Sequence, residues 1–300
     1  MRNQSKTRKP STSGTTATNP METIMKTRHH FRSLGTLAIV CLASFLLVTT
    51  NAVGAPFATI SILDTATGFN NTYQSTSISF SFSGLDLTAG DKLVVSIGAQ
   101  STGAGTVAGE RVWSSVTFDS QAMTEAARIG ANADNQYQSG IYYLDDLAGL
   151  SATGNLTITA ATLNVRGASA TAWVLSGTTD GHGAGAGSLG AGTSLTTTSD
   201  VDSWVLAHAT VAGTTAPTAQ SPLTAGLTVV NPYNGSAQTG NGTGYQTVLA
   251  QSGGVSLTPT FDIGATTVAA EFLAMEVPEP STLILAGLGL AGLTLRRRRK

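Results

Sequence analysis

The stretch Ser77-Ile78-Ser79-Phe80-Ser81-Phe82 alternates small polar and large apolar residues without a break. Successive side chains of a β-strand point to opposite faces of a sheet, so this period of two predicts a strand with one buried face. Leu156 and Ile158, which alternate with threonines, repeat the pattern. Further alternating or short apolar segments predict more strands: Val112–Phe118, Lys92–Ile97, Ile141–Leu144, Ala172–Leu175, Trp204–Ala209, Thr247–Ala250 and Val268–Ala274.

Turn signals separate these segments, and no stretch of residues 56–275 has apolar residues at the spacing of an amphipathic helix. The turns are predicted at Ala89-Gly90-Asp91, Ala152-Thr153-Gly154-Asn155 and Asn234-Gly235. About ten short strands at this spacing predict an all-β body over residues 56–275, folded as an antiparallel, jelly-roll-like sandwich. The glycine-rich segment Gly181–Gly187 is predicted to be a loop, and the polar segment Ser236–Gly244 a mobile one.

The charged residues are distributed unevenly along the chain. Between Pro56 and Pro280, four basic residues stand against 16 acidic ones, a formal charge of −12. A surface of this sign repels the phosphates of nucleic acids, so no nucleic-acid partner is expected. The single cysteine, Cys41, precedes this region, which must therefore build its core from apolar burial alone.

The N-terminal region has the three-part pattern of a secretory signal peptide. Basic residues precede an uncharged apolar stretch from Leu34 to Val48, and the small residues Ala52-Val53-Gly54-Ala55 follow it. The apolar stretch is too short for a comfortable permanent membrane span. We therefore expect residues 25–55 to form a signal helix that engages the secretion translocon and is then removed.

A polar leader rich in Ser and Thr, residues 1–24, stands before this signal. It would make the basic region of the signal peptide unusually long. Translation from Met21 or Met25 would leave it wholly or largely untranslated, so the leader is not counted with the exported body.

The C-terminal residues combine a short polar motif, an apolar run and a basic cluster. Val277-Pro278-Glu279-Pro280 is followed by the uncharged run Leu283–Leu295 and then by Arg296, Arg297, Arg298, Arg299 and Lys300. As a helix the run would span roughly 20 Å against about 30 Å of bilayer core, so it depends on arginines that reach the headgroups. Basic flanks stay cytoplasmic, so the cluster would orient a transmembrane helix over residues 283–295 and act as its membrane stop.

This tail resembles the PEP-CTERM sorting tail of bacterial surface proteins, and the resemblance covers residues 276–300. It implies that an exosortase-type membrane protease recognises Val277, Pro278, Glu279 and Pro280 and cuts nearby. It also implies that the body crosses the cytoplasmic membrane, is held there transiently, and then passes to the cell surface or the extracellular space. The alternative is an ordinary C-terminal anchor that happens to contain Pro-Glu-Pro.

The body offers few groups for catalysis. It has neither a Gly-x-Ser-x-Gly elbow nor a His-Glu-x-x-His motif. His182 lies between glycines, and His208 shares a strand face with Trp204, which predicts a packed core histidine. Asp145 and Asp146 are adjacent, so on a strand they would face opposite sides, which does not suit a glycosidase pair. We therefore predict that the body is not an enzyme and needs no cofactor.

Asp200 and Asp202 form the one candidate metal site in the sequence. On a strand the two carboxylates would share a face, and with carbonyl oxygens they could hold Ca²⁺. A solvated turn before the Trp204 strand explains the pair at least as well. Calcium binding is therefore a secondary prediction.

These features favour an exported structural or adhesive protein of the cell surface or extracellular matrix. The alternative is a carbohydrate-binding module for surface polysaccharide, which needs exposed Trp or Tyr side chains on a concave sheet. Trp113, Trp173 and Trp204 all stand in strand contexts, which predicts their burial. A glycan hydrolase comes third, since it needs two carboxylates that converge in one pocket.

Overall fold

The computed structural model describes residues 57–71, 76–82, 84–101, 113–130, 136–160, 165–230 and 239–277. The predicted signal helix over residues 25–55, the leader before it and the transmembrane helix over residues 283–295 lie outside these ranges. Within them the regular structure consists of strands, and every strand pairing is antiparallel. The prediction of an all-β antiparallel body is therefore confirmed for the described part of the chain.

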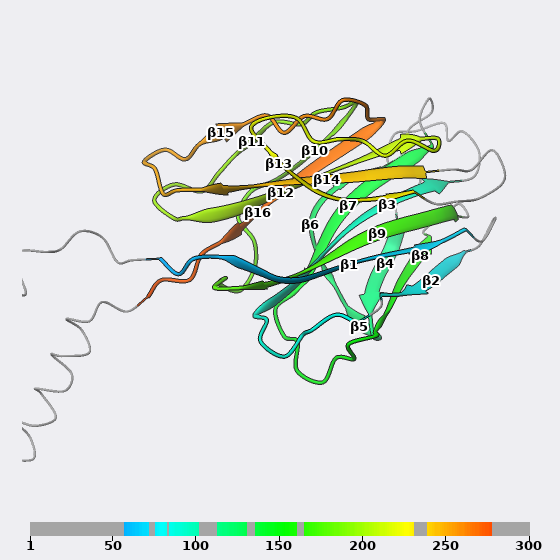
Figure 1. Ribbon diagram of the computed structural model, residues 1–300, viewed down its shortest axis with the longest axis horizontal. Helices are drawn as coiled ribbons and strands as arrows, with labels where there is room; N and C mark the ends of the chain where they lie inside the picture. Colours follow the sequence, from blue (N-terminus) through cyan, green and yellow to red (C-terminus); the bar gives the residue numbers. More distant parts are fainter. Residues whose placement is uncertain are drawn as a thin grey trace, which may run out of the picture. The chain divides into compact units, whose positions relative to one another are not determined.

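The central sheet has the strand order β1-β9-β3-β7-β6 (Figure 1). Its strands are β1 (Ser61–Asn70), β3 (Lys92–Ser101), β6 (Thr124–Ile129), β7 (Tyr137–Leu144) and β9 (Val165–Ser176). In β3, Leu93 and Val95 pack into one apolar cluster while Val94, between them, packs into another. Both faces of this sheet are therefore buried, which explains why its strands carry continuous apolar runs as well as alternating ones.

A four-stranded sheet, β2-β8-β4-β5, covers one face of the central sheet. Its strands are β2 (Ser77–Ser81), β4 (Trp113–Phe118), β5 (Gln121–Ala122) and β8 (Asn155–Ala160). The alternating residues Ile78 and Phe80 are buried, as are Leu156 and Ile158 of the paired strand. These side chains join Leu93, Val95 and Ile97 in a single core, so the period of two identified the buried face of this sheet.

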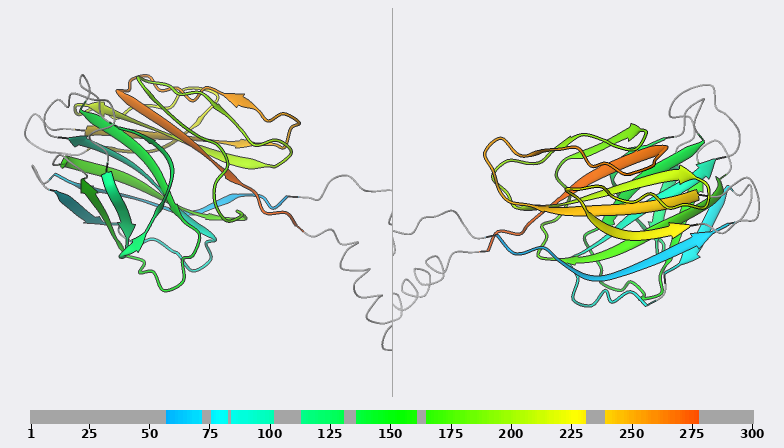
Figure 2. Two further views of the ribbon diagram at one scale, coloured as in Figure 1. Left: turned by 180° about the vertical axis from the view of Figure 1, so that it is seen from behind. Right: turned by 45° about the horizontal axis from the view of Figure 1, so that its top comes forward.

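The C-terminal sheet, β10-β16-β12-β14-β13, covers the other face of the central sheet (Figures 1 and 2). Its strands are β10 (Gly185–Leu189), β12 (Ser203–Ala212), β13 (Thr224–Val230), β14 (Thr239–Val248) and β16 (Thr266–Leu273). Trp204 and Phe272 pack against Trp173 and Tyr143 of the central sheet. The short strands β11 (Leu195–Thr196) and β15 (Ser256–Leu257) pair with each other and contribute to a third core on the outer face.

The stacking of three sheets differs from the predicted single jelly-roll-like sandwich. A two-sheet sandwich buries one face of each sheet, whereas here the central sheet is shared by two cores. The physical reason lies in runs such as Leu93-Val94-Val95 and Ala172-Trp173-Val174-Leu175, where consecutive side chains are all buried. Such runs point apolar groups to both faces and require a covering sheet on each side.

The prediction of a mobile loop over Ser236–Gly244 is wrong for the described residues, which begin at Thr239. Strand β14 runs from there to Val248 and pairs with β12 and β13. On the side of this sheet away from the central sheet, a Cβ added at Gly240, Gly242 or Gly244 would overlap Thr215, Pro217 or Ala219 respectively. The glycines therefore let the 215–219 segment lie directly on the strand backbone, and their period of two marks a strand rather than a loop.

The glycine-rich loop predicted over Gly181–Gly187 is also shorter than expected. Strand β10 starts at Gly185 and pairs with β16, from Gly185 opposite Ala270 to Leu189 opposite Thr266. A Cβ on Gly187 would lie 2.9 Å from the carbonyl oxygen of Arg128 in β6. The absence of a side chain at this position therefore allows β10 to approach the edge of the central sheet.

A polar layer lies between the central and C-terminal sheets at the end away from Trp204. Ser139 bonds Thr210 at 2.8 Å and Thr266 at 2.7 Å, and the amide of Asn241 donates to Ser169. His208, which has no exposed surface, lies 3.2 Å from the hydroxyl of Thr210. The prediction that His208 packs into the core is therefore confirmed, although its neighbours there include hydrogen-bonding groups.

Candidate functional site

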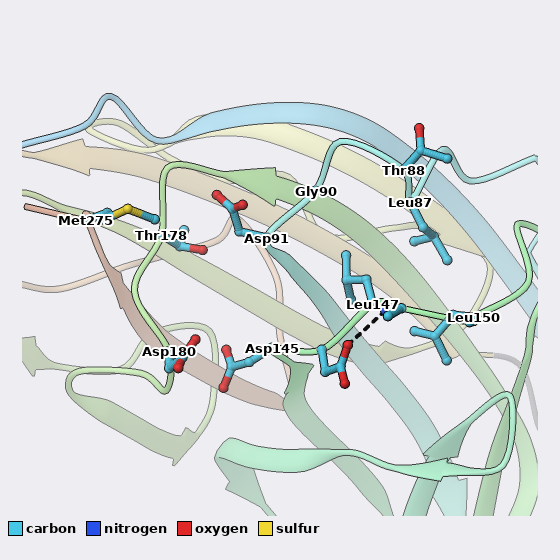
Figure 3. A pocket seen from close by; sticks show the side chains of 13 residues that line it. Leu87, Thr88, Gly90, Asp91, Asp145, Leu147, Leu150, Thr178, Asp180 and Met275 are labelled. Carbon is cyan, nitrogen blue, oxygen red and sulfur yellow. Dashed lines mark hydrogen bonds between the residues drawn. The ribbon is translucent and has the colours of Figure 1, made fainter. Parts of the chain in front are cut away.

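A cavity of about 630 Å³ lies where several strands of the central sheet begin or end (Figure 3). Its walls come from the turn before β3, from the segment after β7, from the segment after β9, and from Met275 after β16. The strand register explains this convergence, because Leu93 pairs with both Leu144 and Val174. The start of β3 and the ends of β7 and β9 thus lie together at one end of the central sheet.

Four aspartates line this cavity: Asp91, Asp145, Asp146 and Asp180. Three of them accept hydrogen bonds from backbone N–H groups, Asp91 from Gly177 at 2.5 Å, Asp145 from Gly181 at 2.9 Å and Asp146 from Ala148 at 2.9 Å. Asp145 and Asp146 were expected to face opposite sides of a sheet only if they lay on a strand, and they do not. Strand β7 ends at Leu144, so both residues lie beyond it and both reach the cavity.

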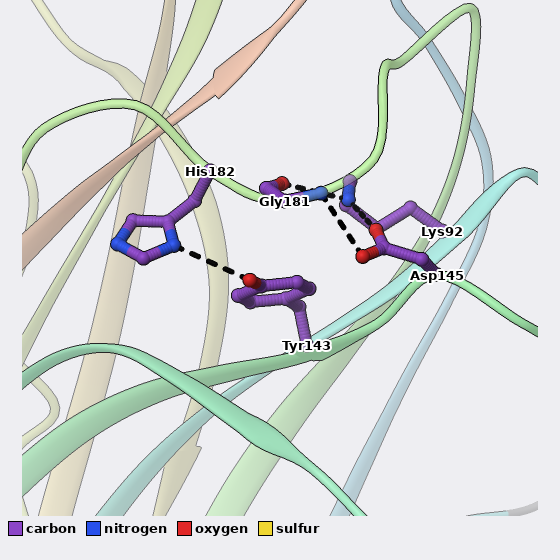
Figure 4. Close-up of polar contacts among 5 residues, drawn as sticks. All are labelled: Lys92, Tyr143, Asp145, Gly181 and His182. Carbon is purple, nitrogen blue, oxygen red and sulfur yellow. Dashed lines mark hydrogen bonds and ion pairs between the residues drawn. The ribbon is translucent and has the colours of Figure 1, made fainter.

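Lys92, the first residue of β3, carries a fully buried ammonium group beside this cavity (Figure 4). The Nζ atom forms an ion pair with Asp145 and donates to the carbonyl oxygen of Gly181 at 2.8 Å. It also lies 4.6 Å from the ring centroid of Tyr143 and 5.8 Å from that of Phe272. Burial lowers the pKa of Lys92 from its ordinary value, while the Asp145 carboxylate opposes this shift.

His182 and Tyr143 lie next to Lys92 and Asp145, and these residues together with Gly181 are called the Lys92 cluster (Figure 4). The Nδ1 atom of His182 lies 3.4 Å from the Tyr143 hydroxyl, and the two ring centroids are 5.4 Å apart. Partial burial, and then the positive charge of Lys92, lower the pKa of His182. The segment Gly181–His182 therefore contacts the ion pair through the Gly181 backbone and contacts Tyr143 through the His182 side chain.

The described chain starts and ends at the same place on the body. Phe57 and Glu276 form an antiparallel bridge, and the N–H of Ala58 donates to the carbonyl of Met275 at 2.7 Å. Beyond this bridge, the sequence profile of the PEP-CTERM protein-sorting motif matches residues 276–299. The chain carries a PEP-CTERM sorting motif. This motif starts at the residue where the last bridge of the β-body ends, and Met275 just before it lines the acidic cavity.

The PEP-CTERM motif implies that the protein is exported and carries a membrane-anchored sorting signal for processing by an exosortase-type partner. No curated protein and no solved structure matches the chain. The described residues contain no helix that could span a bilayer. Within the predicted motif Val277 is 40% exposed, while Pro278, Glu279, Pro280 and the basic cluster Arg296–Lys300 lie outside the described residues.

Asp200 and Asp202, the predicted calcium ligands, lie between β11 and β12. The carboxylate of Asp202 accepts the N–H of Ala250 at 2.6 Å, and Asp200 is exposed with a φ of 61°. In the described ranges, no three or more His, Cys, Asp or Glu residues gather in a way that could hold a metal ion. Calcium binding by this pair stays a prediction.

All three tryptophans are buried, with 3% of Trp113 exposed and 2% each of Trp173 and Trp204. Trp173 and Trp204 pack edge to face, with ring centroids 5.8 Å apart, in the core between the central and C-terminal sheets. Their burial agrees with the prediction from their strand contexts. It removes the tryptophan platform that a carbohydrate-binding module would use.

The sequence interpretation missed the Lys92 cluster. One signal was available, because Lys92 is the only lysine between residues 56 and 280 and directly precedes a buried apolar run. A lysine is almost never fully buried unless it is paired, so its place at the start of such a strand indicates a nearby carboxylate. The identity of that carboxylate depends on the pairing of β3 with β7, which the sequence did not give.

Proposed function

We propose that the protein is a non-catalytic structural or adhesive component of the bacterial cell surface or extracellular matrix. The observation that carries this proposal is the PEP-CTERM motif at residues 276–299, joined directly to an acidic, all-β body. A signal peptide over residues 25–55 and a transmembrane helix over residues 283–295 complete the proposed sorting route. Transfer to the cell surface follows cleavage near Pro278.

The packing of the body supports a structural role. The described sheets bury most of their apolar residues in three cores. Among the large exposed hydrophobic side chains, Leu63 and Phe69 belong to β1, and Leu249 follows β14. A high negative charge keeps such a surface soluble and leaves it able to interact with cationic or hydroxylated matrix components. Surface polysaccharide is the proposed partner class.

The sorting half of the proposal is tested by replacing Pro278, Glu279 and Pro280 with Ala in the native host. We expect an uncleaved form in the membrane fraction, because the protease loses its extended recognition motif. Replacement of Ser281 and Thr282 is the matched control, since it changes the same region outside the Pro-Glu-Pro triplet. A variant at Pro278–Pro280 with wild-type mass and wild-type location would contradict the proposal.

The structural half is tested with the released body. The mature protein should co-sediment with matrix material from its host and should leave the glycan size distribution unchanged. Shortening of the glycan chains would contradict the non-catalytic assignment.

A second candidate function, glycan hydrolysis, is favoured by the aspartates that share the 630 Å³ cavity. A hydrolase of this kind needs one carboxyl as acid and another as base or nucleophile. Asp180 and Asp146 are the pair to test, because Asp145 is held in the ion pair with Lys92. If hydrolysis occurs, Asp180→Asn and Asp146→Asn should each abolish it. Retention of activity in both variants would show that this cavity is not the site of hydrolysis.

A further inference from the structure

The ion pair of Lys92 and Asp145 joins the first residue of β3 to the residue directly after β7. Leu93 of β3 pairs with Leu144 of β7, so continuing the antiparallel register by one residue places Lys92 opposite Asp145. Opposed residues in an antiparallel pair have Cβ atoms only about 5 Å apart. The amine and the carboxyl are therefore held against each other by the sheet itself.

The surroundings of this pair differ from those of a surface salt bridge. The Lys92 side chain is 0% exposed, whereas that of Asp145 is 30% exposed toward the acidic cavity. The aromatic rings of Tyr143 and Phe272 replace water around the ammonium group. Removing an ammonium group from water is costly, and burial favours its neutral form.

The backbone of Gly181 forms hydrogen bonds with both members of the ion pair, Lys92 and Asp145 (Figure 4). Its N–H donates to Oδ2 of Asp145 at 2.9 Å, and its carbonyl oxygen accepts from Nζ of Lys92 at 2.8 Å. The first contact places a donor where negative charge would develop if a nucleophile attacked the carboxyl carbon. The second orients the amine. Gly181 has a φ of +78°, a conformation that favours glycine.

We propose that Lys92 and Asp145 condense into an intramolecular amide bond that cross-links β3 to the segment after β7. In this reaction a proton first moves from Nζ to Oδ1 along the hydrogen bond, which gives a neutral amine and a neutral carboxylic acid. The nitrogen lone pair then attacks Cγ, the N–Cγ bond forms, and Oδ1 leaves as water with a second proton from nitrogen. Oδ2 remains as the amide oxygen and keeps the Gly181 hydrogen bond.

This reaction needs no oxidant and no external reagent, because one water molecule is the only other product. Asp145 lines the open cavity, so the water has a route out. Holding amine and carboxyl in one orientation supplies the effective concentration that the uncatalysed condensation lacks. The lowered pKa of Lys92 supports the step, since it increases the share of neutral amine.

The test is the intact mass of the folded full chain followed by peptide mapping. The cross-link lowers the mass by one water, about 18 Da, and gives one branched peptide that contains both Lys92 and Asp145. Asp145→Asn retains an electrophilic carbonyl and should lose ammonia instead, about 17 Da. Lys92→Arg and Asp145→Ala should show no loss of mass.

Asp146→Ala is the matched control, because this neighbouring carboxylate lines the same cavity but is turned to the N–H of Ala148. It should keep the branched peptide and the loss of water. A folded wild-type chain with unmodified mass overturns the proposal, and so does a loss of water that maps to any other residue. Both results come from the wild-type protein, so they stand even where a variant fails to fold.

Discussion

His208 should make the stability of the body sensitive to mild acid. Its imidazole is fully buried in the polar layer between the central and C-terminal sheets, and burial lowers its pKa to about 3. In the unfolded chain the pKa returns to its ordinary value of about 6.5. Between these two pH values the unfolded chain binds one more proton at this residue than the folded protein does.

The size and the sign of the effect follow from this difference. Each pKa unit is worth about 1.4 kcal/mol, so lowering the pH from about 6.5 to about 5 should remove about 2 kcal/mol of unfolding free energy through His208 alone. The contribution is complete above pH 6.5 and is lost progressively as the pH falls toward about 3. His182, whose pKa burial also lowers, adds to the loss over the same range, so the His208 share must be measured as a difference between variants.

Urea unfolding at several pH values provides the measurement. His208→Gln keeps a polar side chain next to Thr210 and does not titrate, so its stability should fall with pH by about 2 kcal/mol less than that of the wild type. His182→Gln is the control, because His182 is only half-buried and its loss leaves the His208 contribution in place. Equal pH slopes for wild type and His208→Gln would refute the reasoning.

Three further predictions concern the outer face of the C-terminal sheet and its end. Gly242→Ala should destabilise the body by about 1–3 kcal/mol in urea unfolding, because the new Cβ overlaps the Pro217 carbonyl; unchanged stability would show that the 215–219 segment does not lie on β14. Glu271→Ala should cost about 3 kcal/mol, because the fully buried carboxylate accepts hydrogen bonds from Ala184 and Thr198. Glu271→Gln, which keeps one acceptor oxygen, should cost less, and equal losses would contradict this account. If Asp200 and Asp202 bind Ca²⁺, the melting temperature should rise with added calcium in the wild type but not in Asp202→Ala. A wild-type melting temperature that does not change with calcium would contradict the prediction.

Local patterns predicted several of the strands, among them β2, β3 and β12, but not β1, β6 or β13, and not how the sheets stack. Ile78 and Phe80 could be assigned to a buried face, because the period of two is a property of one strand. The burial of Val94 on the opposite side from Leu93 depends on a second covering sheet from much later in the chain. The pattern within one strand does not show whether a second sheet covers its other face, so the sequence favoured a sandwich of two sheets.

Glycine-rich segments were the weakest part of the sequence interpretation. Gly240, Gly242 and Gly244 have the composition of a loop, yet they form a strand whose backbone is covered directly by another segment. Composition favours a loop because glycine lowers strand propensity, whereas close backbone approach demands glycine. The alternation of the three residues was the signal that could have separated the two interpretations.

The candidate site was predictable only in part. The sorting tail could be identified from residues 277–300 alone, because its motif, apolar run and basic cluster are consecutive. The Lys92 cluster could not, since its members come from β3, from the end of β7 and the segment after it, and from the segment after β9. Their meeting depends on strand register, which side-chain periodicity does not specify.

The place of β16 in the sheet has a mechanical consequence for a protein sorted through its C-terminus. This strand leads directly to the sorting motif, and it is flanked on both sides, by β10 from Thr266 to Ala270 and by β12 from Thr266 to Leu273. Hydrogen bonds in antiparallel pairs run perpendicular to the strands. A pull along β16 from the tail therefore loads both rows of bonds in shear, and they resist together rather than opening one after another. A body tethered in this way can bear tension at its attachment point without being unzipped from its end.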